Sequence, residues 1–178
     1  MAGAEAAVLV RPDGAPVGGA WQTWVDRSKV PTAPGPVLFA FDHCPRAVGG
    51  CYWGYPDWDG RPREVRISPL LTSGNGWRRE ALLHELGHDF DAHVMTGAAR
   101  RRFMVIMRYP TAPWRGPHGE VQPPIERFAD AYSECAIYGA ARDQEVEGKL
   151  PGFANDPTPH QHRRVCSLIR RVGYRGSK

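Results

Sequence analysis

The pattern of apolar and polar positions predicts short strands in the first half of the chain and longer helices in the second half. Residues 37–41 form a compact apolar run after a Pro-Gly-Pro turn, which is typical of a buried strand. Segments 51–55 and 64–68 alternate apolar and polar residues, and residues 56–60 between them have turn chemistry, so we expect a hairpin. A short helix is expected over residues 19–30.

The second half of the chain shows helical periodicity. In its clearest element, Leu82, Leu86 and Phe90 recur at every fourth position and form one apolar face. A second long helix is predicted to begin at the proline pair 123–124, because proline suits the first turn of a helix. The segments predicted for this half are helices over 77–95, 98–109, 124–141 and 160–172 and loops over 109–124 and 144–159.

Length and composition are those of an ordinary globular protein. A chain of 178 residues with 42% hydrophobic residues defaults to one domain, spanning residues 1–178. Residues 1–10 lack a basic leader and an apolar run long enough for a signal peptide, and no segment approaches the ~20 apolar residues of a membrane span. We therefore expect a soluble protein that acts in the cytoplasm or is carried in a virion, without a membrane partner.

The net charge of +4 comes partly from two arginine-rich segments, at 100–102 and along 163–175. Neither a nucleic-acid motif nor interleaved aromatic residues accompany these arginines. We interpret them as solvated helix faces and do not expect nucleic acid as a partner.

The four cysteines are not expected to form a disulfide framework in a reducing compartment. Cys44 and Cys51 could close a short loop if the protein meets an oxidant. Cys135, on the second long helix, is expected to pack in the core.

The sequence His84-Glu85-Leu86-Gly87-His88 lies inside the predicted helix 77–95 and has the pattern H-E-x-x-H. Residues four apart on a helix lie about 40° apart, so the imidazoles of His84 and His88 can reach one metal ion. Glu85 is rotated about 100° from His84 and is placed to contact a water on that ion. Zinc with three protein ligands lowers the pKa of such a water to about 7, and Glu85 would accept its proton as general base.

The expected third ligand is Glu126, on the second long helix. Asp130 follows one turn later and can accept a hydrogen bond from a ligand imidazole, most simply that of His84. The alternative is an ordinary amphipathic helix with solvated acids. Asp91 and Val94 stand where a metzincin would have glycine and a third histidine, so that arrangement is excluded. Asp91 lies about 20° from His84 on the helix wheel and is either a supporting group or a surface or capping acid.

Hydrolysis of a peptide also needs a group that stabilises the oxyanion. We favour His162 as this second catalytic residue, because the terminal helix must pack near the core, with a structural role as the alternative. The other candidates are Tyr132, Tyr138, His118 and His160.

With these motifs the sequence resembles the gluzincin division of zinc metallopeptidases, in which H-E-x-x-H is joined by a glutamate from a later helix and an acid four residues on. It is also similar to small actinobacterial and actinophage proteins with an H-E-L-G-H helix and an E-x-F-A-D-A-Y helix. The resemblance covers about residues 64–141. Ile125 departs from it, because thermolysin-like enzymes often have asparagine there.

The resemblance implies a zincin-like α+β fold, with a small twisted sheet packed on the motif helix and a second helix that bears Glu126. It also implies Zn²⁺ as cofactor and hydrolysis of peptide bonds in a peptide or protein substrate. If the second strand of the hairpin is the sheet edge above the metal, an extended peptide could pair with it.

The alternative is a catalytically silent zincin fold that serves as a phage component or as the partner of a toxin or regulator. Glu85 favours the enzyme, because a structural zinc site needs no general base.

Overall fold

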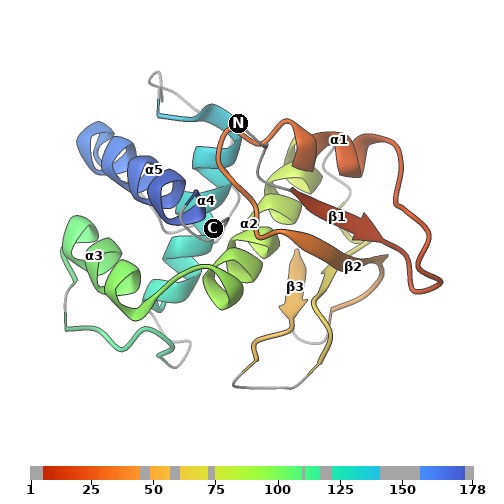
Figure 1. Cartoon of the computed structure of the whole chain (residues 1–178), viewed down its shortest axis with the longest axis horizontal. Helices are drawn as coiled ribbons and strands as arrows, with labels where there is room; N and C mark the ends of the chain where they lie inside the picture. Colours follow the sequence, from red (N-terminus) through yellow and green to blue (C-terminus); the bar gives the residue numbers. More distant parts are fainter. Residues whose placement is uncertain are drawn as a thin grey trace.

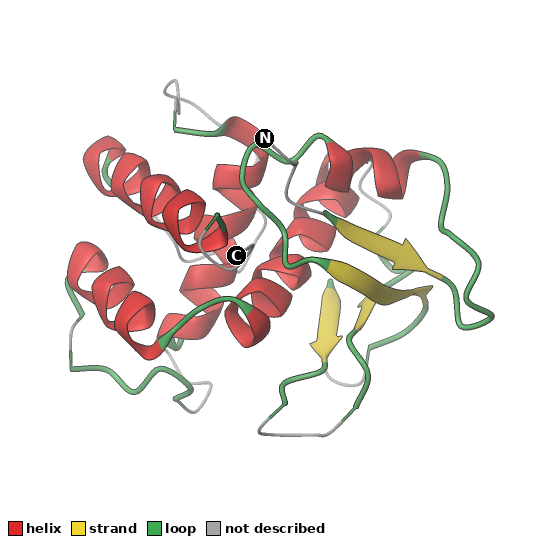
Figure 2. Cartoon of the chain, in the orientation of Figure 1, coloured by secondary structure: helices red, strands yellow, loops and turns green. Residues whose placement is uncertain are grey.

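The computed structural model describes residues 6–44, 49–56, 61–71, 75–109, 111–116, 122–140 and 157–174. Within these ranges the protein is an α+β structure with one four-stranded mixed sheet and five helices (Figure 2). The elements in chain order are β1 (Ala7–Val10), α1 (Ala20–Asp26), β2 (Gly35–Phe41), β3 (Gly50–Trp53), β4 (Glu64–Ile67), α2 (Asn75–His93), α3 (Gly97–Met107), α4 (Pro124–Tyr138) and α5 (Pro159–Gly173).

The sheet has the strand order β1-β2-β4-β3. β1, β2 and β4 run parallel, and β3 pairs antiparallel with β4. The predicted hairpin and the buried strand 37–41 are confirmed. The expectation that the second hairpin strand forms the sheet edge is wrong, because β4 pairs with β2 on its other side, as in the register Phe39↔Val65. The edge strand of the hairpin is β3.

β1 was not predicted. It is only four residues long, too short for a clear alternation, although Ala7 and Leu9 are fully buried. Distant side chains hold it in place: the Ala7 amide donates to the Thr32 hydroxyl at 2.7 Å, and the Leu9 amide donates to Gln22 Oε1 at 2.9 Å. A strand whose position depends on distant side chains is hard to predict from its own residues.

The motif helix α2 lies between the sheet and the other long helices (Figure 1). It packs on β3 and β4 with one side and on α4 with another. Its predicted apolar face is confirmed, since Leu82, Leu86 and Phe90 are all buried. α3 and α5 lie at the end of the molecule opposite the sheet (Figure 1). Among the described helices, none combines the length and apolar character needed to cross a bilayer.

Two disulfides correct the expectation of reduced cysteines. Cys44 and Cys51 close the short loop that leads into β3, and Cys135 of α4 is bonded to Cys166 of α5. Cys135 is indeed fully buried, as predicted, but the face of α4 that carries it is the one on which α5 packs. This packing brings together two cysteines that are 31 positions apart, and local spacing gives no sign of it.

Candidate metal centre

Three side chains from two helices meet at one point between α2 and α4. His84 Nε2 and His88 Nε2 are 3.2 Å apart, and Glu126 Oε2 lies 3.4 Å from each of them. The two histidines come from successive turns of α2, and Glu126 comes from the first turn of α4. The structure therefore brings together the three expected metal ligands.

A close approach of the two helices allows this meeting. A Cβ atom added to Gly87 would lie 2.9 Å from Ala129 Cα and 3.1 Å from Tyr132 Cβ. Such distances are too short for any side chain, so α4 crosses α2 where α2 has glycine and α4 has alanine. Gly87 of α2 and Ala129 of α4 are small enough to let the helices approach, and this approach brings Glu126 within reach of the imidazoles.

Each imidazole is oriented by a partner on its other nitrogen. Asp130, 1% exposed, lies 2.8 Å from His84 Nδ1, and the Tyr55 hydroxyl lies 3.0 Å from His88 Nδ1. When Nδ1–H donates to these oxygens, the Nε2 lone pairs point at the shared centre. Asp130 had been expected in this place. Tyr55 had not, because a tyrosine at the end of an alternating segment has the pattern of a core residue.

Glu85 lies beside the three ligands and is 6% exposed. One of its oxygens lies within 4.8 Å of a nitrogen of each imidazole. Its carboxylate packs against Gly50 of the edge strand β3, where an added Cβ would come within 2.7 Å of Glu85 Oε1. Glu85 therefore lies between the centre and the edge strand β3.

The charges of the site favour a cation at its centre. Burial raises the pKa of Glu85, although the nearby imidazoles oppose this. Burial acts on Glu126 as well, but His88 and His84 outweigh it and hold the pKa of that carboxyl well below its usual range. Hydrogen bonds to Asp130 and Glu126 raise the pKa of His84 despite its burial. Three carboxylates around two imidazoles thus stabilise positive charge where the three ligand atoms meet.

Asp91 is buried on α2 but bonds to neither ligand histidine among the described contacts. Its carboxylate accepts from Arg100 Nε at 2.7 Å and from Trp114 Nε1 at 3.2 Å. It thereby ties α3 and the segment 111–116 to the motif helix. Of the two expectations for Asp91, support of a ligand and a surface or capping acid, neither describes this buried anchor.

His162 does not lie at the centre, which corrects its expected role as oxyanion stabiliser. Its Nε2 donates to Gly139 O at 2.7 Å, beyond the end of α4 opposite to Glu126. Gly139 lies thirteen positions after Glu126, which corresponds to about 20 Å along the axis of α4. The terminal helix does pack on the core, but His162 lies at the C-terminal end of α4, whereas Glu126 is in the first turn of that helix.

The other oxyanion candidates gain no support. Tyr132 is buried, and its hydroxyl donates to Pro31 O at 2.9 Å. His160 is exposed on α5, and His118 lies outside the described residues. Cys135, His162 and Cys166 form a second buried group of potential metal ligands, but their two sulfurs are bonded to each other.

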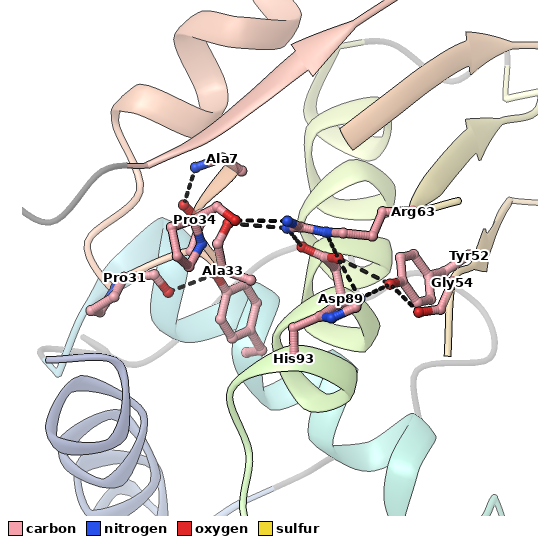
Figure 3. Close-up of polar contacts among 11 residues, drawn as sticks. Ala7, Pro31, Ala33, Pro34, Tyr52, Gly54, Arg63, Asp89 and His93 are labelled. Atoms are coloured by element: carbon pink, nitrogen blue, oxygen red, sulfur yellow. Dashed lines mark hydrogen bonds and ion pairs between the residues drawn. The ribbon is translucent and has the colours of Figure 1, made fainter. Parts of the chain in front are cut away.

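A buried ion pair joins α2 to the sheet (Figure 3). Arg63, just before β4, donates to both carboxylate oxygens of Asp89, at 2.6 and 2.8 Å. The Tyr52 hydroxyl of β3 lies 3.0 Å from Asp89 Oδ1 and 3.0 Å from His93 Nε2. His93 thus belongs to this network, which attaches the motif helix to the sheet.

Part of the predicted loop 109–124 lies beside the centre. Trp114 packs edge-on against Phe103, with ring centroids 5.8 Å apart, and is held by Asp91. The Arg115 guanidinium lies 4.3 Å from the centroid of the Tyr55 ring. Residues 111–116 are therefore anchored next to the group that orients His88, while residues 117–121 lie outside the described residues.

The chain matches no known protein family and shows no significant similarity to a curated protein or to a solved structure. The functional argument therefore depends on the geometry of the site.

Proposed function

We propose that the protein is a zinc-dependent metallopeptidase with a zincin-like fold. One observation carries the proposal: His84 Nε2, His88 Nε2 and Glu126 Oε2 form a triangle with sides of 3.2 to 3.4 Å. Ligand atoms about 2.0–2.1 Å from a tetrahedral zinc ion are about 3.3–3.4 Å apart, so the triangle fits the base of such a site. Two imidazoles and one carboxylate, with one position left open, are the ligand set of a catalytic zinc rather than of a structural one.

When bound, a zinc ion would polarise the scissile carbonyl and lower the pKa of water at the open position. Glu85 accepts a proton from the attacking water and passes it to the leaving amine. Burial raises the pKa of Glu85 above its usual value, which helps this carboxylate to accept a proton and then to donate it. Asp130 and Tyr55 hold the two imidazoles in the orientation that binding requires.

The position of β3 supports a peptide as the substrate. β3 is an edge strand of the sheet, and its Gly50 touches the carboxylate of Glu85. An extended peptide that pairs with this edge would run past the general base, with main-chain hydrogen bonds setting its register. The strand that would receive the peptide is β3, not β4.

Metal analysis of purified protein, compared with His88→Ala and Glu126→Ala, tests the centre. We expect about one zinc per chain in the wild type and a large loss in both variants. Zinc retained in Glu126→Ala would contradict the ligand set.

Glu85→Gln separates an enzyme from a silent zincin fold. We expect this variant to keep its zinc and to lose hydrolysis of a mixed peptide library followed by mass spectrometry. Equal hydrolysis by wild type and Glu85→Gln would contradict the role of Glu85. A zinc-loaded wild type that cleaves no peptide would favour a binding or structural protein.

A further inference from the structure

A groove lies between α3 and α5, at the end of the molecule opposite the sheet (Figure 1). It has a volume of about 220 Å³. One wall comes from the exposed face of α5 and the other from α3. The residues that line it are Arg102, Ile106, His160, Arg163, Arg164, Ser167 and Arg171.

The groove carries positive charge that the described residues do not neutralise. Neither α3 nor α5 contains an acidic residue. The side chains of Arg102, Arg163 and Arg164 are exposed, and within the described ranges none of them pairs with a carboxylate. Arg171 donates only to the carbonyl of Ser167, at 3.3 Å. By contrast, Arg100, on the core side of α3, pairs with Asp91.

The walls of the groove are held in place by packing that does not involve these arginines. Ile106 is buried beneath the groove, and Gln161 Nε2 donates to its carbonyl at 2.9 Å. A capping box between Thr158 and Gln161 fixes the start of α5, and the Cys135–Cys166 disulfide ties α5 to α4. The arginines therefore extend from a preformed frame.

We propose that this groove binds the phosphodiester backbone of a nucleic acid. Arg163, Arg164 and Arg171 lie along about 12 Å of one helix, the axial length of three to four successive phosphates on a strand. Guanidinium forks bind phosphate oxygens in pairs, which suits arginine to this contact. Contacts to phosphates carry no sequence information, so we expect binding that is independent of sequence.

Two other polyanions fit the groove less well. Helices that bind membranes carry large apolar side chains beside their basic residues. Here the large apolar residues of both helices are buried, apart from the exposed Val105 and the half-buried Val172. An acidic peptide would match the charge, but its carboxylates do not repeat at a fixed spacing along a backbone, as phosphates do.

The test is fluorescence anisotropy with a labelled mixed-sequence DNA duplex at several salt concentrations. If four arginines each neutralise one phosphate, the logarithm of the binding constant falls with the logarithm of salt with a slope of about −3 to −4. Affinity then drops about 100-fold between 50 and 200 mM salt. Arg163→Ala/Arg164→Ala should reduce the slope by about two and weaken binding at low salt at least tenfold.

The matched control is Arg11→Ala/Arg27→Ala, which removes the same charge from exposed positions near β1 and α1. It should change the slope little. If both double variants lose the same affinity for DNA, the binding depends only on net charge, and the proposal is overturned. Preferential binding to vesicles containing phosphatidylserine, or competition by polyglutamate as effective as by DNA, would also overturn it. Since the substituted arginines are exposed, circular dichroism and zinc content should not change in any variant.

Discussion

The two ligand imidazoles are supported by different chemical groups. A buried carboxylate, Asp130, orients His84, whereas a neutral phenol, Tyr55, orients His88. A carboxylate increases the basicity of its histidine, while a phenol mainly fixes the angle of the ring. The two histidines are therefore not chemically equivalent, although both belong to the same H-E-x-x-H motif.

Tyr55→Phe tests this support. The substitution keeps the ring that packs between Tyr52 and Arg115 and removes only the hydroxyl at 3.0 Å from His88. We expect zinc affinity to fall about 10- to 100-fold, the usual cost of losing such a partner. Competition with a chromogenic chelator measures it. Tyr174→Phe, at an exposed position, is the control, and equal affinities in the two variants would contradict a role for the Tyr55 hydroxyl.

The helices and most strands follow from local patterns, but their partners do not. Periodicity alone gives α2, because its buried face repeats through Leu82, Leu86 and Phe90. It also places Glu126 and Asp130 one turn apart on α4. It cannot place Tyr55, whose contact with His88 spans 33 positions, or His162, which packs at one of two possible ends of α4. Glu126 and Asp130 were predicted at the site because they stand at the positions of the motif that the sequence resembles. The contacts of Tyr55 and His162 depend on how the elements pack, and they were not predicted.

The crossing of α2 and α4 depends on Gly87. Gly87→Ala places a methyl group 2.9 Å from Ala129 Cα, so the helices must separate. We expect a loss of about 1–3 kcal/mol in the free energy of unfolding from overpacking, together with weaker zinc binding, because Glu126 moves away from the imidazoles. Urea unfolding and zinc titration measure the two effects.

Gly76→Ala is the matched control on the same helix, since an added Cβ there meets nothing within 4 Å. Alanine favours helix over glycine by up to about 1 kcal/mol, so this variant should be as stable as the wild type or slightly more stable. If both variants bind zinc like the wild type, the close crossing does not determine the position of Glu126.

At the scale of the whole molecule, one disulfide joins two helices and the other closes a loop beside the sheet. Cys135–Cys166 fastens α5 to α4, and Cys44–Cys51 closes the loop before β3. The same scale explains the arginine groove, because Arg102 of α3 and the arginines of α5 that line the groove are far apart in sequence. Each segment alone has the pattern of a solvated helix face, and only the packing of α3 on α5 makes them one surface.

The two disulfides should differ in their contribution to stability. A cross-link stabilises the fold mainly by restricting the unfolded chain, and the effect grows with the separation of the cysteines. The separations of 31 and 7 residues correspond to about 3–4 and about 2–2.5 kcal/mol. We therefore expect Cys135→Ala/Cys166→Ala to lose more stability than Cys44→Ala/Cys51→Ala in urea unfolding. The opposite order would show that packing around the sulfurs outweighs this effect.

The ion pair between Arg63 and Asp89 would also affect how the proposed centre takes up a metal ion. It fastens α2 to the sheet through Asp89, while α4 packs against α2 at Gly87. Neither attachment involves a ligand atom, so the ligands are assembled before an ion arrives. Metal ions could then exchange without any refolding of the chain. The supply of free zinc in the surroundings, and not the folding yield, would set the fraction of molecules that are active.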